Sequence, residues 1–523
     1  MRRSISIGLV GAIAGMIALS AACERRRPPR DTVVLLISDS IRSVDPRFAL
    51  TAGDMKLSRL IAPGLLALDT PDMVPRLELA ERIDRIDDVT WQVVLRPGLR
   101  FSDGTPLTAA DVAWTYTSTF AKGSDSPFGK NLAERFKAVE AVDERTVRFR
   151  LVAPLATLMT DLDFGILSGR GADRAGHIPG GRVVGAGPFR LVSVGSRRLV
   201  LEANPHYHGG PPPSRRVDVR VVTDAAARIL MLVGGSADLL QNAVRLDLVD
   251  DVVKYPHLRV ESAPSVILTY LLMNNRDPVL ADVRVRRAIA LAIDRPAIIA
   301  HKLKGRAVPA TGLIAPGSWA YEPDVPRWDH DLARAARLLD EAGLVDPDGP
   351  GPAPRLRLTF KTSTDQLRVA MARVLTAQLA RVGIAVDVRS FETATFDADI
   401  KTGTYQLAIR QTNEIGEPDY YFTYFNSSRI PSPTLRDGTN RWWYRNARVD
   451  ELTERGRREL DRGRRYAIYS EVQKIVAGDV PVVALWHEHN IVVRNRQVEG
   501  YRITPNAKLS GLVTAAKTPE GDR

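Results

Sequence analysis

The chain has almost no cysteine, since Cys23 is the only one among its 523 residues. A lone cysteine excludes an intramolecular disulfide and a metal site built from several thiolates. No cysteine remains after residue 23 to act as a nucleophile. Stability must therefore come from packing of the rest of the chain.

The sequence also lacks the common motifs of catalysis and cofactor binding. It has no His-Glu-x-x-His pair, no recognisable Ser-His-Asp arrangement and no phosphate loop. The glycines at Gly185 and Gly187 do not form a phosphate cradle, because Pro188 has no N–H to donate and a strand is expected next. We expect no catalytic residue, no cofactor and no metal.

Long apolar runs are missing except at the N-terminus. There Arg2 and Arg3 precede an uncharged run from Ile5 to Ala22 that ends in small residues. This pattern predicts a signal peptide over 1–22, because it is too short and wrongly flanked for a stable membrane span. Cys23 would then be the new N-terminus and a site for lipidation, with 23–30 as an extended linker. An inert Cys23 after ordinary signal cleavage is the alternative.

Charge and length limit the remaining possibilities. The net charge is +12, but the arginines are scattered through the expected helices and strands, so we expect a solvated surface and no nucleic-acid partner. With 44% hydrophobic and 26% charged residues, the body is that of a water-soluble protein. At about 150 residues per domain, 523 residues predict two or three lobes.

Hydrophobic periodicity predicts a mixed α/β protein. Expected strands are Thr32–Ile37, Thr90–Leu95, Thr146–Leu151, Gly185–Val192, Leu199–Tyr207, Leu268–Asn274, Arg355–Phe360, Ile384–Arg389 and Val480–Trp486. Expected helices are Leu57–Leu66 with its turn, Asp282–Lys302, Leu332–Ala342, Leu367–Val382, Val449–Leu460 and Arg465–Val476. The alternation from Arg355 to Arg389 is typical of an α/β lobe.

The corner from Leu95 to Trp114 contains two neighbouring carboxylates with structural explanations. Asp103 precedes Gly104 in a tight turn, and Thr108 with Asp111 fits a helix N-cap and its reciprocal acid. Neither acid is therefore a good catalytic candidate.

Five motifs in order resemble the extracytoplasmic substrate-binding proteins of ABC importers, in the peptide, dipeptide and nickel family. They are Leu95–Gly98 with Phe101–Val112, Gly187–Leu191, Asn204–Tyr207, Val283–Asp294 and Leu338–Gly343. The resemblance implies an α/β, two-lobed periplasmic-binding-protein clamshell of type II, in the large peptide-binding class with an extra subdomain. It places lobe I at 31–266 with the subdomain near 52–180, lobe II at 267–486, a return to lobe I at 487–515 and a tail at 516–523. The chain would cross between lobes near 263–267 and 485–489.

The resemblance further implies a monomeric, extracytoplasmic binder without catalysis. It would capture a small solute, most plausibly a short peptide, between the lobes and deliver it to the membrane permease. The fold does not settle the ligand. An oligosaccharide, an opine or a nickel chelate, a tethered sensor, and an exported hydrolase with paired carboxylates remain alternatives.

The resemblance also suggests binding residues. Glu414 matches the carboxylate that receives a ligand amine, although the family usually has Asp, and a solvent-facing loop acid is the alternative. Asn413 and Gln411 lie beside it, with Gln411 where a cleft Trp is frequent, and Lys361 matches the basic residue that holds a carboxylate. Trp319, Tyr420 and Tyr421 would form an aromatic wall or belong to the core.

Two further groups of side chains could bind a ligand but have simpler explanations. Trp442–Tyr444 could stack on a sugar or a base, but a surface or packing cluster fits better. His487 and His489 lie on one face of a strand and could contact a metal, but a hinge position is the preferred interpretation.

Overall fold

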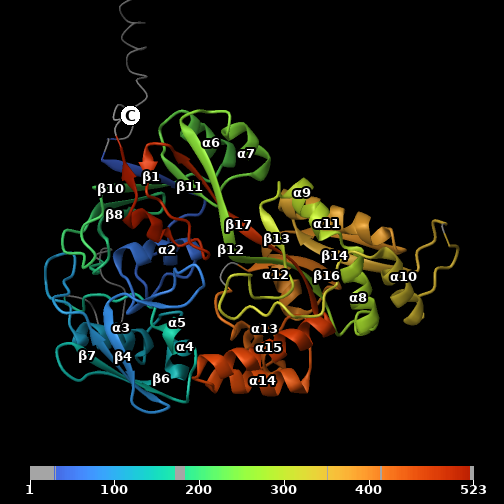
Figure 1. Ribbon diagram of the computed structural model, residues 1–523, viewed down its shortest axis with the longest axis horizontal. Coiled ribbons are helices and arrows are strands. Elements are labelled where there is room, and N and C mark those ends of the chain that lie inside the picture. The colour runs from blue at the N-terminus through green and yellow to red at the C-terminus, as the bar shows by residue number, and fades with distance from the viewer. Residues whose placement is uncertain (1–28, 30, 171–182, 350, 413–414, 519–523) are drawn as a thin grey trace, which may run out of the picture.

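The computed structural model describes residues 29, 31–170, 183–349, 351–412 and 415–518. An 11-stranded sheet runs through two lobes, and a separate four-stranded sheet forms a subdomain (Figure 1). The long sheet has the order β15-β14-β16-β12-β17-β11-β1-β10-β9-β8, with β13 paired to β17. Among the described residues, no helix is both long and apolar enough to span a membrane.

Two long antiparallel strands belong to both lobes. β12 (Leu258–Met273) pairs with β17 (Val482–Asn495) along its length, with an irregularity between Pro264 and Leu268. The first half of β12 lies in lobe I, and the second half pairs with β16 (Leu407–Thr412) of lobe II. Both strands are longer than predicted. The prediction was too short because the apolar pattern is lost where the strands pass from one lobe to the other. The lobe boundaries predicted at 266/267 and 486/487 fall within these strands and stay predictions.

Lobe I is built around β1 (Thr32–Ile37), a buried strand as predicted. It lies parallel to β10 (Arg216–Val221) and β11 (Leu239–Gln241), and β9 (Arg198–Ala203) and β8 (Phe189–Gly195) extend the sheet. The remaining elements of this lobe are α2 (Ala52–Ile61), α6 (Ala225–Val233), α7 (Leu246–Val252), β18 (Val498–Glu499), η3 (Leu509–Val513) and β19 (Ala516–Lys517). α2 begins five residues before the predicted Leu57, because Thr51 caps it by accepting from the Asp54 N–H.

The subdomain holds its own apolar core between a sheet and short helices. Its sheet has the order β4 (Ala80–Arg85), β5 (Thr90–Leu95), β7 (Thr146–Leu151), β6 (Phe136–Ala141), and its other elements are β2 (Leu66–Ala67), β3 (Arg76–Leu77), α3 (Ala109–Phe120), α4 (Gly129–Arg135) and α5 (Leu158–Asp161). Asp111 accepts from the Thr108 N–H at 2.9 Å, and Asp103 accepts from the Thr105 N–H at 2.9 Å. The predicted cap and turn are confirmed.

Lobe II contains the predicted parallel β-α-β unit. β14 (Leu356–Ser363) pairs in parallel with β15 (Ile384–Phe391), and α11 (Gln366–Ala380) connects them. α10 (Leu332–Glu341) ends before Gly343, which has a φ of +82°, as the predicted stop requires. β13 (Ala307–Pro309) and α12 (Thr393–Thr402) complete this side of the lobe.

The single helix predicted over Asp282–Lys302 is wrong, because the structure divides it into two. α8 (Val283–Ala292) ends before Ile293, and α9 (Arg295–Lys302) begins after Asp294. The Asp294 side chain accepts from the Ala297 N–H at 2.9 Å, and Pro296 lies in the first turn. An acidic cap followed by proline starts a new helix even where the apolar periodicity continues.

The other face of lobe II carries a helical cluster beside the subdomain (Figure 1). It consists of α13 (Tyr420–Phe425), η2 (Ser427–Arg429), α14 (Ala447–Arg458) and α15 (Arg462–Asp479). Trp442, Trp443 and Tyr444 are buried in the core of this cluster, which confirms the packing interpretation.

Candidate binding cleft

A cavity of about 570 Å³, the first cavity, lies where the lobes meet. Lobe I contributes Asp39 and the start of α2, and lobe II contributes the start of α11 and the end of β16. The crossing strands contribute Thr269, Glu488 and His489. A space of this size between two lobes is typical of a small-molecule site.

Glu488 brings a negative charge to this cavity. It lies on β17 at the crossing, and its Oε1 accepts from Gln411 Nε2 at 2.7 Å and from Thr269 Oγ1 at 2.7 Å. Both donors are neutral, and no ion pair joins Glu488 to a cation among the described residues. The hydrogen bonds orient the carboxylate without neutralising it, so the part of the cavity next to Glu488 favours a cationic group.

Two arginines that precede Gln411 in the sequence also line the first cavity. Arg306 precedes β13, and Arg368 lies in the first turn of α11. Within the described part of the chain, neither guanidinium has a carboxylate partner, and Arg306 Nε is buried without a hydrogen-bond acceptor. A half-buried guanidinium without an acid is complementary to a carboxylate or another anion.

The two histidines at the crossing differ in their surroundings. His489 Nδ1 lies 3.1 Å from Ser262 Oγ, and burial together with the nearby charge of Arg306 lowers the pKa of His489. His487 is 1% exposed, and burial lowers the pKa of its imidazole to about 4. Among the described residues, no group of three His, Cys, Asp or Glu side chains is arranged to hold a metal.

A second cavity of about 700 Å³ lies between the subdomain and the helical cluster of lobe II. Its charged side chains are mostly paired. Arg135 contacts Asp161, Lys508 Nζ lies 2.5 Å from Asp163 Oδ2, Arg457 Nε lies 3.4 Å from Asp419 Oδ1, and Arg465 contacts Glu417. Burial raises the pKa of Glu417 to about 7, although Arg465 opposes the rise.

The residues predicted from the sequence lie in different places. Gln411 lines the first cavity, and Tyr420 lines the second. Glu414 and Asn413 lie outside the described residues. Tyr421 is 1% exposed and belongs to the core.

Lys361 and Trp319 already have partners within the protein. Lys361 Nζ lies 2.6 Å from Asp399 Oδ2 and 5.0 Å from the centre of the Phe391 ring. The Trp319 N–H donates to the Asp72 carbonyl of lobe I at 3.1 Å, and Arg462 stacks 4.9 Å above its ring. Trp319 therefore joins the lobes through its backbone.

Sequence reasoning missed Glu488, Arg306 and Arg368. Glu488 lies on β17, Arg368 in the first turn of α11 and Arg306 in the turn between α9 and β13, and charged residues at such places usually face solvent. The signal for Glu488 was its place in the polar stretch His487–Asn490, which interrupts apolar residues on both sides where the strand passes from one lobe to the other. A charge in the middle of a central strand is a sign of a cavity on that face.

Comparison with known proteins connects this two-lobed cleft to solute binding. The family model "Bacterial extracellular solute-binding proteins, family 5 Middle" matches residues 74–432. The probable D,D-dipeptide-binding periplasmic protein DdpA of Escherichia coli is 29% identical over 433 residues, covering 80% of each chain. The glutathione-binding protein GsiB of Shigella dysenteriae is 26% identical, covering 97% of each chain.

The solved structures agree on the fold. The ABC transporter substrate-binding protein CtaP of Listeria monocytogenes has a TM-score of 0.82 at 23% identity, covering 93% of this chain and 99% of that one. It confirms the predicted two-lobed architecture. Because the family model matches more than half of the sequence, the chain belongs to family 5 of the bacterial extracellular solute-binding proteins.

Proposed function

We propose that this protein is the solute-capturing lipoprotein of an ABC importer and that its ligand is a short peptide with free termini. Family membership supports a binding role and a permease partner, and the D,D-dipeptide and glutathione relatives support a peptide. The protein would act as a monomer on the extracytoplasmic side of the membrane. Solute would enter between the lobes and be handed to the permease after closure.

The charge pattern of the first cavity is the observation that carries the peptide proposal. Glu488 provides a carboxylate without a cationic partner, and Arg306 and Arg368 provide guanidinium groups without a carboxylate partner, all within the described residues. A zwitterion supplies both missing charges at once, because its ammonium pairs with the acid and its carboxylate with an arginine. A neutral sugar would leave these charges uncompensated.

Glu414 remains the proposed second contact of the amine. It follows Gln411 by three positions, and Gln411 already donates to Glu488 in the first cavity. Asn413 and Gln411 would supply hydrogen bonds beside it. Two acids would then lie near one ammonium, because a desolvated cation is costly without negative charge beside it.

Lipidation of Cys23 would hold the protein at the membrane near its permease. Two or more acyl chains suffice for stable anchoring, since each buried CH₂ contributes about 0.8 kcal/mol. In the bacterial host, Cys23→Ser should move the protein from the membrane fraction to the soluble fraction. Mass spectrometry of the wild-type N-terminus should find a diacylglyceryl group, and an unmodified cysteine would contradict the anchor.

Isothermal titration calorimetry against a matched panel tests the ligand class. The panel contains di- to pentaalanine, the same peptides with acetylated or amidated ends, oligosaccharides, opines and nickel chelates. We expect binding of peptides with free ends and a loss of about 2–4 kcal/mol for N-acetylated peptides or for Glu488→Gln with the free peptide. Glu414→Gln should weaken the same peptides.

The controls separate the alternatives. For N-acetylated peptides, Glu488→Gln should change affinity little, because the charge that it pairs with is already gone. Binding of a sugar or a nickel chelate and of no peptide would overturn the proposal. Steady release of amino acids from a bound peptide by the pure protein would favour a hydrolase.

A further inference from the structure

The strand order of the long sheet places the two arginines of the first cavity on either side of its acid. Glu488 lies on β17, and its carboxylate is held by Gln411 of β16 and Thr269 of β12. Arg368 belongs to α11, which follows β14, and β14 pairs with β16 on that same side. Arg306 directly precedes β13, which pairs with β17 on the side away from β12. The two arginines therefore come from elements on opposite sides of Glu488.

Arg306 and His489 form a corner of the first cavity whose donors are poorly satisfied. The Arg306 carbonyl accepts from the His489 N–H at 2.9 Å, and the charge of Arg306 adds to burial in lowering the pKa of His489. Among the described residues, the Arg306 guanidinium makes one hydrogen bond, a long one of 3.4 Å to the Lys304 carbonyl. When His489 Nδ1 accepts from the Ser262 hydroxyl, Nε2 carries the hydrogen, and no described group accepts it. A carboxylate is the acceptor that this corner lacks.

The acids of the protein near this corner are already paired or exposed. α7 of lobe I lies beside it, because Lys304, two positions before Arg306, forms an ion pair with this helix. Asp39 and Asp365 line the cavity but are exposed, and neither forms an ion pair within the described residues. Each of the three acids of α7 has another cation as its partner: Asp247 with Arg245, Asp250 with Lys304 at 3.4 Å, and Asp251 with Lys254 at 2.6 Å.

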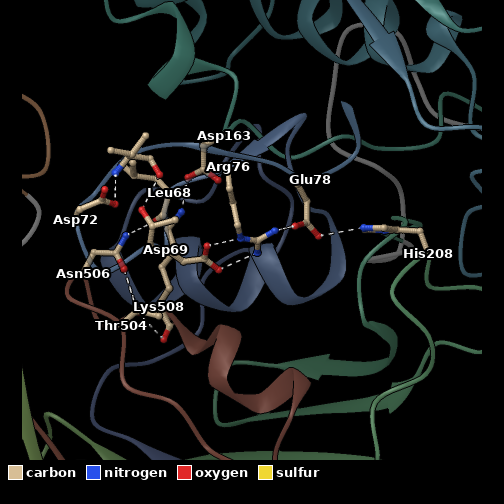
Figure 2. A network of polar contacts seen from close by, with 12 residues as sticks. Leu68, Asp69, Asp72, Arg76, Glu78, Asp163, His208, Thr504, Asn506 and Lys508 are labelled. Atoms are coloured by element: carbon tan, nitrogen blue, oxygen red, sulfur yellow. Dashed lines mark hydrogen bonds and ion pairs between the residues drawn. The ribbon is translucent and has the colours of Figure 1, made fainter. Parts of the chain in front are cut away.

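The network in Figure 2 shows the contrasting case, in which cations are paired by acids of the protein. Arg76, although exposed, binds both oxygens of Asp69, at 2.7 and 3.0 Å, and also contacts Glu78. Lys508 Nζ lies 2.5 Å from Asp163 Oδ2. A half-buried guanidinium such as that of Arg306 is costlier to leave unpaired than an exposed one, because it has lost part of its hydration.

A peptide with a single carboxylate completes only one side of this arrangement. Its amine would lie at Glu488, and its C-terminal carboxylate would pair with one of the two arginines. The other arginine comes from the far side of Glu488 and would be enclosed in the cleft without an anion. A second carboxylate on the ligand removes this cost.

We propose that Arg306, with His489 beside it, is a subsite for an acidic side chain, so that the protein selects peptides containing aspartate or glutamate. This inference rests on the proposed peptide-binding function. The ligand amine would pair with Glu488, the C-terminal carboxylate with Arg368 and the side-chain carboxylate with Arg306. A cavity of about 570 Å³ is large enough for a short peptide of this kind.

Isothermal titration calorimetry with matched tripeptides tests the subsite. Ala-Glu-Ala and Ala-Ala-Glu are compared with Ala-Gln-Ala and Ala-Ala-Gln, which have nearly the same shape without the side-chain charge. We expect the wild-type protein to bind at least one Glu peptide about tenfold more tightly than its Gln counterpart, the gain from one charge-assisted contact.

Two variants assign this preference to its residue. Arg306→Met should remove the preference, because it should weaken the Glu peptide much more than the Gln peptide. Lys302→Met is the matched control, since Lys302 is exposed on α9 and lies outside the lining of the first cavity. It removes the same charge from the protein and should keep the wild-type preference.

The outcomes distinguish this inference from the function on which it rests. Wild-type protein that binds neither these tripeptides nor the alanine peptides would overturn the proposed function and the subsite together. Equal binding of the Glu and Gln peptides by the wild-type protein would overturn the subsite alone.

The variants can overturn the subsite in two further ways. An equal loss for Glu and Gln peptides in Arg306→Met would mean that Arg306 holds the C-terminal carboxylate. A preference that survives in Arg306→Met, or that disappears in Lys302→Met, would mean that it does not come from a contact with Arg306. Thermal unfolding verifies that each variant is folded, and Arg306→Gln repeats the test if Arg306→Met is not.

Discussion

The two interlobe cavities are similar in size, but the first has charged side chains without partners and the second has charged side chains that are mostly paired. In the first, Glu488, Arg306 and Arg368 lack partners of opposite charge among the described residues. In the second, Arg465 pairs with Glu417, Arg135 with Asp161 and Lys508 with Asp163. Charges that the protein neutralises itself stabilise the fold, whereas charges that it leaves open are available to a ligand. Substitutions in the two cavities should therefore change different measurements.

The largest effect is expected from breaking the buried pair of the second cavity. Arg465 and Glu417 are 5% and 9% exposed, so Arg465→Met leaves a buried acid without its cation. The free energy of unfolding should fall by about 3–5 kcal/mol. Urea denaturation followed by circular dichroism measures it. The double variant Arg465→Met/Glu417→Gln should recover part of the loss, and a single variant as stable as wild type would contradict the comparison.

The buried His487 of the crossing strand β17 should make the free energy of unfolding depend on pH. His487 has a folded-state pKa of about 4, and an unfolded histidine titrates near about 6.5. Between these values the unfolded chain binds more protons, so stability is complete above the upper value and falls as the pH decreases toward the lower one. The loss should be roughly 2–3 kcal/mol.

His487→Gln isolates this contribution. Urea denaturation of both proteins at several pH values between about 4 and about 6.5 shows how steeply the free energy of unfolding changes with pH in each. The variant should lose less stability on acidification than wild type. Parallel pH profiles of the two proteins would contradict the lowered pKa of His487, because a histidine with the same pKa in both states adds no pH dependence to stability.

Substitution of Arg368 should weaken peptide binding, a smaller effect than the two above, whereas substitution of Lys361 should not. Arg368 lines the first cavity without an acid, whereas Lys361 is paired with Asp399. Arg368→Met should weaken free peptides by about 1–2 kcal/mol and C-terminally amidated peptides little, because the lost contact is to the carboxylate. Lys361→Met is the matched control and should leave calorimetric affinity near that of wild type. The reverse result would return the carboxylate contact to Lys361.

The smallest effect is expected at the surface of the second cavity. Among the described residues, Glu454 forms an ion pair with Arg458 alone, at 3.5 Å on the same helix. Glu454→Gln should change neither peptide affinity nor unfolding free energy by more than about 0.5 kcal/mol. A clear loss of peptide binding would mean that the ligand reaches the second cavity in the wild-type protein.

Sequence patterns predicted regular elements well where local chemistry decides them. The cap at Thr108, the stop at Gly343 and the unit from β14 to β15 follow from side chains within a few residues. The break between α8 and α9 was also encoded locally, in Asp294 and Pro296, but the apolar periodicity concealed it.

The cleft was harder to predict, because its residues are assembled over long distances. The resemblance supplied Gln411, which lines the first cavity. Glu488 on β17 and Arg368 on α11 are far apart in sequence and line the same cavity only because of the tertiary fold.

The position of β17 in the sheet has a consequence for biosynthesis. β17 lies between β12 and β11, so it joins the two halves of the sheet, yet it begins at Val482. A ribosome has therefore translated nearly the whole message before the strand that completes either lobe exists. Contacts this distant in sequence form late and slowly. A nascent chain that stops before Val482 leaves two sheets with open edges, which is the state that chaperones recognise.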